Sequence, residues 1–124
     1  MPKGKYVDGF VIAIPKKNKE AYIKMAKEGR AAWKKFGALD YKECVLDIEK
    51  PNECISLTFP QMIQAKPGET VWFSFITYKS KKHREEVNKK VMAYFEKKYS
   101  AKEMKMPFDM QRFTCAGFTV EVGM

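Results

Sequence analysis

Two residues of the chain have side chains that could exchange a proton. His83 is the only histidine, and Asp8 lies in an apolar segment near the start of the chain. An aspartate that orients an imidazole raises its pKa towards the working pH, which makes a general acid/base pair. The alternative is structural: Asp8 caps a backbone group or pairs with a lysine, and His83 packs over the first turn of its helix. Asp8 and His83 are thus the candidate catalytic residues.

Four further residues are candidates for ligand binding: Asp109, Arg112, Glu43 and Tyr78. Asp109 and Arg112 are three positions apart, just before the last predicted strand. Either they form a salt bridge that fixes the preceding loop, or Arg112 holds an anionic group of a substrate. Glu43 and Tyr78 are expected at the same end of the fold as Asp8.

The composition argues against a metal, a cofactor or a disulfide framework. One histidine and scattered carboxylates offer no zinc or iron ligand set, and no heme-ligand or monooxygenase constellation is evident. The three cysteines, Cys44, Cys54 and Cys115, are odd in number and have no pair at CxxC spacing. Reduced thiols in a cytoplasm fit better. Cys44, next to a carboxylate that raises the pKa of a thiol, is expected to be a core residue.

The elements that must position these residues alternate between strands and helices. Residues 6–14 are apolar on both alternating faces, which indicates a central strand. Residues 18–36 form a predicted helix, with Asn18 as its N-cap and Gly37 as its C-cap signal. Ser80 caps a second predicted helix. Further strands are predicted at residues 39–48, 70–78 and 113–122, and the connection at residues 49–69 includes a candidate helical turn at residues 61–65.

This βαββαβ order predicts one ferredoxin-like α+β domain that spans residues 1–124. With right-handed crossovers it gives a four-stranded antiparallel sheet, strand order 4-1-3-2, that carries both helices on one face. Antiparallel strands then place two groups of polar residues at opposite ends of the sheet: Asp8, Glu43, Tyr78 and His83 at one end, and Asp109 and Arg112 at the other.

The face of the sheet opposite the helices is expected to be hydrophobic. The first strand is apolar on both sides, and Val71, Phe73 and Phe75 alternate with Trp72 and Ile76 on the third. Such a face exceeds the few hundred Å² of apolar patch that a soluble monomer tolerates. We therefore expect a homodimer in which two copies pack through their sheet faces, a dimeric α+β barrel.

The net charge of +9 is carried by the two predicted helices. Residues 16–35 hold eight cations against two acids, and residues 79–105 hold ten against four. Basic segments suggest polyanionic partners, and residues 73–78 have the aromatic spacing of an RNA recognition strand. However, only three of the 24 cations are arginine, and the lysines belong to the helices rather than to the sheet. Nucleic-acid binding is therefore the less favoured alternative.

Short matches to a known family run in order along nearly the whole chain. They include Tyr6–Val11, Gly37–Leu39, Glu69–Val71, Tyr78–Ser80 with His83 and Arg84, and Met106–Asp109 with Arg112. In these residues the sequence resembles the YbaA-like bacterial family, a domain-of-unknown-function family. The resemblance implies a dimeric α+β barrel in which two ferredoxin-like sheets pack face to face, and it brings no catalytic residues.

From these observations we expect a cytoplasmic protein that binds an unidentified small molecule between sheet and helices, near the mouth of the barrel. A cofactor-independent enzyme is one form of that function. The alternatives are a module that binds RNA or other nucleic acid through the basic helices or the aromatic sheet face, and a purely structural dimer. No association with a membrane is expected, because no apolar run approaches the ~18 residues of a membrane span.

Overall fold

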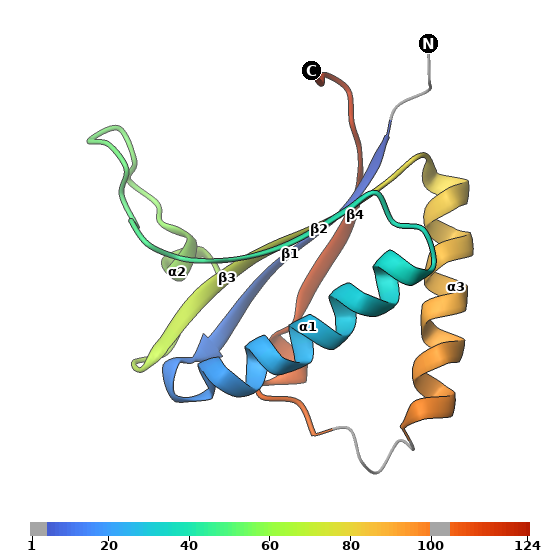
Figure 1. The fold of residues 1–124 in the computed structure, drawn as a ribbon. Helices are drawn as coiled ribbons and strands as arrows, with labels where there is room; N and C mark the ends of the chain where they lie inside the picture. Colours follow the sequence, from blue (N-terminus) through green and yellow to red (C-terminus); the bar gives the residue numbers. More distant parts are fainter. Residues whose placement is uncertain (1–4, 100–104) are drawn as a thin grey trace.

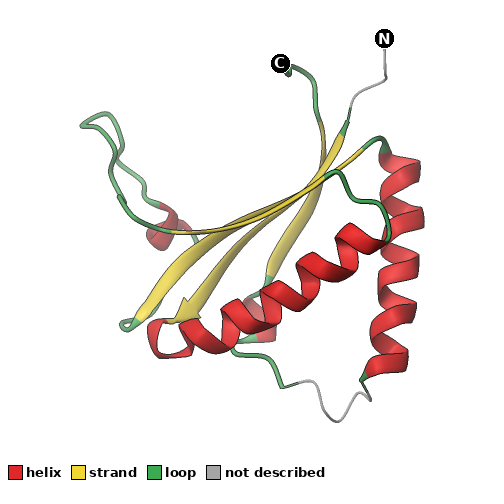
Figure 2. Ribbon diagram, in the orientation of Figure 1, coloured by secondary structure: helices red, strands yellow, loops and turns green. Residues whose placement is uncertain are grey.

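The sheet at the centre of the fold has four antiparallel strands. A computed structural model describes residues 5–99 and 105–124, and Figures 1 and 2 show the elements in space. The strands are β1 (Tyr6–Pro15), β2 (Asp40–Val45), β3 (Glu69–Tyr78) and β4 (Thr114–Thr119). They lie in the order β2-β3-β1-β4, which is 4-1-3-2 when read from β4. The prediction of an α+β chain with a four-stranded antiparallel sheet is confirmed.

Both long helices lie on the same side of the sheet (Figure 1). They are α1 (Lys19–Lys35) and α3 (Lys81–Lys98). The buried residues of α1 recur every three or four positions, which is the period of one helical face: Tyr22, Ala26, Gly29 and Ala32. The connections contain η1 (Lys16–Asn18), α2 (Phe59–Met62) and η3 (Met110–Arg112). Among the described residues, no helix is long and apolar enough to cross a membrane.

The two predicted helix N-caps differ in the structure. Ser80 caps α3 as predicted, because its hydroxyl accepts a hydrogen bond from the backbone N–H of His83 at 3.0 Å. Asn18 makes no capping bond to α1. Its side-chain amide instead donates to the backbone carbonyl of Pro107 at 2.8 Å, so it ties the start of α1 to a distant loop. Gly37 follows the end of α1 with a φ of 106°, which glycine adopts without strain.

The core lies between the sheet and helices α1 and α3. Alternate residues of β1 and β3 point towards the helices, and Ile12 pairs with Trp72 across these two strands. The rings of Trp72 and Tyr22 pack with centroids 4.8 Å apart. The helix-facing core forms two clusters, one of Ile12, Ile14, Tyr22, Ala26, Trp72 and Phe108, the other of Ala32, Ile76, Tyr78, Val87 and Val91. These clusters fill the middle of the fold, so a ligand cleft has to lie at an end of the sheet.

The opposite face of the sheet, called the sheet face below, is apolar at its centre. The residues that alternate with the core positions point to it: Val7 and Val11 of β1, Phe73 and Phe75 of β3, and Phe118 of β4. Phe73 is 44% exposed and Phe118 is 55% exposed. Figure 2 shows both long helices on the other side of the sheet. The sheet face is therefore open around Phe73 and Phe118, as the sequence predicted, but it is covered at one end, where Val71 and Ala13 also point to it and are only 1% and 4% exposed.

Cys44 also lies on the sheet face, paired with Phe73 across β2 and β3. Its thiol is exposed, so the prediction of a core cysteine is wrong. The reason is the place of β2, which is an edge strand whose residues on this face have no helix over them. An adjacent carboxylate in the sequence carries no information about which face a strand residue takes.

Residues 46–68, called the arm below, connect β2 to β3 and extend away from the sheet on the side opposite α1 and α3 (Figure 1). The arm contains α2, which begins at Phe59 rather than at residue 61. Thr58 accepts a hydrogen bond from the backbone N–H of Gln61, and the Gln61 side chain accepts one from the backbone N–H of Thr58. This capping box fixes where the helix starts. β2 ends at Val45 instead of residue 48, because the chain leaves the sheet there to form the arm.

Candidate functional site

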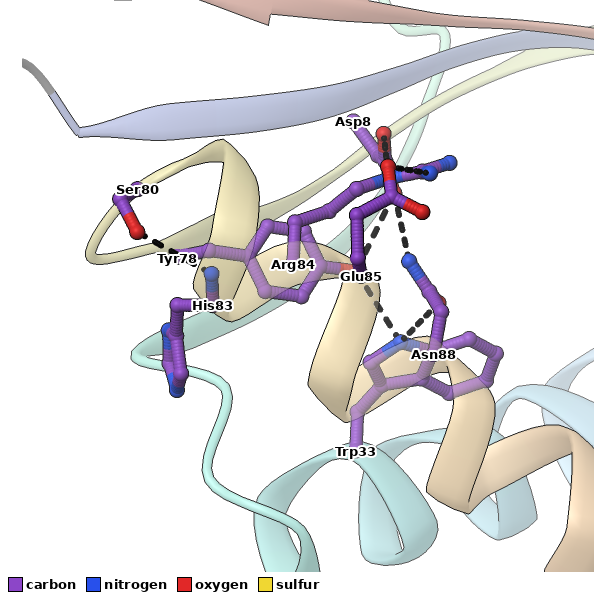
Figure 3. Close-up of polar contacts among 8 residues, drawn as sticks. All are labelled: Asp8, Trp33, Tyr78, Ser80, His83, Arg84, Glu85 and Asn88. Atoms are coloured by element: carbon purple, nitrogen blue, oxygen red, sulfur yellow. Dashed lines mark hydrogen bonds and ion pairs between the residues drawn. The ribbon is translucent and has the colours of Figure 1, made fainter.

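Asp8 is a buried carboxylate held by three side chains, and it is 2% exposed. Nε of Arg84 donates to both carboxylate oxygens at 3.0 Å, and the Tyr78 hydroxyl donates to Oδ2 at 3.1 Å. Nδ2 of Asn88 lies 3.5 Å from the same oxygen. Figure 3 shows these side chains converging on Asp8. The guanidinium compensates the carboxylate, which makes burial of the charge tolerable.

The partners of Asp8 come from two elements, β3 and α3, and a third element, α1, holds those partners. Arg84 and Asn88 are four residues apart on α3 and therefore share one face of that helix. Nε1 of Trp33, on α1, donates to the Tyr78 hydroxyl and to Oδ1 of Asn88, both at 3.1 Å. Burial, and then the charge of Asp8, raise the pKa of Tyr78 above its ordinary value, so this hydroxyl stays a donor. This network of side-chain hydrogen bonds joins β1, β3, α1 and α3 and holds them together.

His83 does not contact Asp8, although both lie towards the same end of the sheet. Nδ1 of His83 accepts a hydrogen bond from the backbone N–H of Lys79 at 2.9 Å, and its ring meets Tyr78 edge to face, with centroids 6.1 Å apart. In Figure 3 the imidazole points away from the carboxylate. The expected contact is therefore wrong: helix rotation turns the next residue, Arg84, inward instead. That Asp8 or His83 transfers a proton stays a prediction.

Glu43 is held by three hydroxyl groups. Oε1 accepts from Tyr22 at 2.7 Å and also from Ser74, and Oε2 accepts from Tyr41 at 2.8 Å. No lysine or arginine of the described residues forms an ion pair with it. Burial first, and then Glu43, raise the pKa of Tyr22 and of Tyr41, so both phenols stay protonated. Gly29 of α1 makes room, because a Cβ there would lie 2.9 Å from the Tyr41 hydroxyl.

Arg112 binds a partner that the sequence analysis did not consider. Its two terminal nitrogens donate to the two carboxylate oxygens of Glu69 at 2.8 Å, and one also donates to the carbonyl of Gln64 at 3.2 Å. The hydrogen bonds from Arg112 lower the pKa of Glu69 to about 2. Asp109 instead caps η3 by accepting from the backbone N–H of Gln111 at 2.9 Å. The predicted Asp109–Arg112 salt bridge is therefore wrong, and both terminal nitrogens of Arg112 are bonded within the protein.

An open cleft of about 330 Å³ lies at the end of the sheet, under η1 and the first residue of α1. Its two charged lining residues, Lys16 and Lys19, are exposed and form no ion pair with any described residue. Its walls are mostly apolar. The full lining is Pro15, Lys16, Lys19, Val45, Leu46, Thr70 and Trp72.

Trp72 brings an unused donor to this cleft. Its indole N–H bonds to none of the described residues, and it is not among the polar atoms sealed away from solvent without a partner. Trp72 is one of the residues that line the cleft. The cleft thus combines an N–H donor, two cations and an apolar wall, which is the make-up of a site for a small amphipathic anion.

The cleft and Glu43 are neighbours on the helix side of the sheet. Val45 pairs with Trp72 at the cleft, and Glu43 pairs with Ser74 two positions along the same two strands. Tyr22 packs on Trp72 and donates to Glu43, so one tyrosine links them. A second hollow of about 330 Å³ is lined by Asn18, Ala21, Met25 and residues 105–107, and the side-chain amide of Asn18 donates there to the Pro107 carbonyl.

The structure brings two pairs of the predicted site residues together, Tyr78 with Asp8 through a hydrogen bond and Tyr78 with His83 through ring packing. It keeps Glu43 apart from them. The residues that the sequence analysis missed are the partners of these side chains and the cleft itself: Tyr22, Trp33, Tyr41, Glu69, Ser74, Arg84, Asn88, and Lys16, Lys19 and Trp72. The i, i+4 spacing of Arg84 and Asn88 beside the buried Val87 and Val91 was the one available signal. Nowhere in residues 5–99 or 105–124 do three His, Cys, Asp or Glu side chains gather as metal ligands.

Comparison with known proteins extends the resemblance seen in the sequence. Residues 5–110 match the model of a family described as protein of unknown function, DUF1428. The uncharacterized protein YbaA of Escherichia coli K12 is 39% identical over 114 residues, which cover 92% of this chain and 94% of that protein. YbaA of Shigella flexneri matches equally well. Among solved structures, the de novo designed protein Foldit4 aligns over 96% of this chain and 99% of its own, with a TM-score of 0.42 and 13% identity.

Proposed function

Because the chain belongs to DUF1428, a family of proteins of unknown function, its activity has to be inferred from its site, and we propose that it binds a small organic anion in the cleft at the start of α1. The observation that carries this proposal is the indole N–H of Trp72. It has no partner among the described residues, and Trp72 lines a cleft with two unpaired lysines.

The lining of the cleft suggests the class of ligand. Lys16 and Lys19 supply positive charge, and the Trp72 N–H supplies one directed hydrogen bond, which together suit a carboxylate. Val45 and Leu46 supply apolar surface, which suits a hydrocarbon or aromatic body attached to that carboxylate. The volume of about 330 Å³ lies at the lower end of ligand pockets, which span roughly 300–1,000 Å³. A small acid with an apolar body therefore fits better than a nucleotide.

Self-association is the second part of the proposal. Two ferredoxin-like copies pack through their sheet faces to form a dimeric α+β barrel, and the support is the exposure of Phe73 and Phe118 on an apolar surface. Cytoplasmic location is supported by the three free cysteines, Cys44, Cys54 and Cys115. For an enzymatic step the candidate carboxylate is Glu43, which Tyr22 links to Trp72 of the cleft, since Arg84 already compensates Asp8.

The Trp72 N–H provides a direct test by nuclear magnetic resonance. The chain has two tryptophans, and the Trp33 N–H is bonded to Tyr78 and Asn88 far along the sheet, so it serves as an internal reference. We expect titration with benzoate to shift the Trp72 indole resonance and to leave that of Trp33 in place. A Trp72→Phe variant assigns the two signals.

Matched charge variants distinguish binding of benzoate at the cleft from nonspecific attraction of an anion to a basic protein. Lys16→Gln/Lys19→Gln removes the two cations of the cleft, and Lys24→Gln/Lys27→Gln removes two exposed cations further along α1. We expect the first pair to abolish the benzoate shift and the second pair to retain it. An unmoved Trp72 signal, or equal loss in both pairs, would contradict the proposed site.

A further inference from the structure

The arm exposes large apolar side chains away from the core of its own subunit. Ile48 is 64% exposed and Leu57 is 65% exposed, and Phe59 and Met62 of α2 are each about half exposed. All four belong to one connection, whereas ordinary surfaces expose such residues singly and scattered. Exposed apolar surface of this kind is expected to be covered by a binding partner.

The arm is held in place at both of its ends. At its start, the backbone N–H of Leu46 donates to the carbonyl of Val71 at 2.9 Å, and at its end the carbonyl of Gly68 accepts from the backbone N–H of Lys16 at 2.8 Å. Arg112 also donates to the carbonyl of Gln64. With the capping box of α2, these bonds fix the direction of the arm. Its apolar residues are thus presented outward before any partner binds, which reduces the entropy lost on binding.

The position of the arm indicates what it binds. It extends on the same side of the sheet as the open sheet face (Figure 1), so a body seated on that face lies beside it. A second copy of this chain presents the same apolar sheet face, so an apolar arm beside that face is complementary to it.

We propose that the arm clasps the partner subunit, so that each copy of a two-fold dimer holds the other with residues 46–68. This inference rests on the proposed sheet-to-sheet dimer. By the two-fold symmetry, both arms make the same contact, so each substitution in the arm counts twice per dimer. Ile48 and Leu57 lie in the proposed interface.

Sedimentation velocity over a range of concentrations tests the clasp. The arm variant is Ile48→Ser/Leu57→Ser, and the control is Val122→Ser, which changes an apolar residue that is 93% exposed outside the arm. We expect the wild type and the control to form dimers with the same Kd. The arm variant should raise the Kd by about tenfold or more, because truncating buried interface side chains commonly costs that much.

A sheet-face variant separates this inference from the dimer on which it rests. Phe73→Glu places a charge on the sheet face and is expected to give monomers. If Phe73→Glu dissociates the dimer while the arm variant keeps the wild-type Kd, the clasp is overturned and the sheet-to-sheet dimer stands. If the wild type itself is a monomer, both are overturned. Circular dichroism shows whether the variants keep the wild-type helix content.

Discussion

The guanidinium of Arg84 lies 3.0 Å from both carboxylate oxygens of Asp8 and so joins the central strand β1 to the first turn of α3. The carboxylate is almost fully buried, whereas the Arg84 side chain remains 29% exposed. Arg84 thus compensates the negative charge of Asp8, the one acid on β1. Because Asp8 binds Arg84, it does not pair with His83, the other predicted catalytic residue.

Removing the guanidinium should destabilise the fold. In Arg84→Met, Asp8 stays buried without compensation, and we expect a loss of about 3 kcal/mol in the free energy of unfolding, the lower end for such pairs because Arg84 is partly exposed. Urea denaturation measures the loss, with exposed Lys82→Met as the control. The double variant Asp8→Asn/Arg84→Met should recover part of it. An Arg84→Met protein as stable as the control would show that the pair contributes nothing.

Ligand binding should not depend on Asp8 or His83. Asp8→Asn and His83→Gln are expected to bind benzoate with wild-type affinity, because both residues lie away from the cleft, where Asp8 is bonded to Arg84 and Nδ1 of His83 to the Lys79 backbone. The benzoate titration of the Trp72 signal measures this. Loss of affinity in a variant that keeps its fold would show that the substituted residue, Asp8 or His83, takes part in binding.

Acid should weaken the contact between Arg112 and Glu69. The pKa of Glu69 is lowered from 4.5 to about 2, chiefly by the hydrogen bonds from Arg112. A carboxyl whose pKa is lower in the folded state stabilises the fold above its ordinary pKa, and the contribution is lost as the pH falls towards 2. Arg112→Gln should therefore lower Tm at pH 6 and have little effect at pH 2. The control is exposed Lys17→Gln, and an Arg112→Gln effect of equal size at both pH values would contradict the expectation.

Gly29 should resist replacement by alanine although it lies within a helix. Alanine in a helix is favoured over glycine by about 1 kcal/mol, but its Cβ would displace the Tyr41 hydroxyl from Glu43. A hydrogen bond to a charged group is worth about 1.5–3 kcal/mol, so Gly29→Ala should be less stable than the wild type. In a Tyr41→Phe background the same change should stabilise the protein. Thermal unfolding of the four proteins completes this double-mutant cycle, and an equal effect in both backgrounds would rule out the proposed conflict.

Periodicity was sufficient for the elements but not for the contacts between side chains. The alternation of β1 and β3 and the caps at Ser80 and Gly37 predicted the strands and helices within a few residues. The choice between His83 and Arg84 as partner of Asp8 depends on the rotation of α3 about its axis, and adjacent residues of a helix point about 100° apart. Spacing in the sequence does not fix that angle.

The other missed contacts depend on long connections. Arg112 binds Glu69, which is 43 residues away, rather than Asp109 three residues away. The cleft forms where the arm leaves the sheet, so its lining comes from three separate segments of the chain. Neither arrangement follows from local pattern, because each requires knowing where the arm returns to the sheet.

Native mass spectrometry of protein purified from a bacterial cytoplasm tests the central claim most directly, because it reads the number of subunits and the retained ligand together. The account predicts a dimer of twice the 14.4 kDa chain that carries a small acid, which is released on activation and is absent from Lys16→Gln/Lys19→Gln. A monomer without such a ligand would contradict it. A monomer that retains an oligonucleotide would instead assign the open sheet face to nucleic-acid binding.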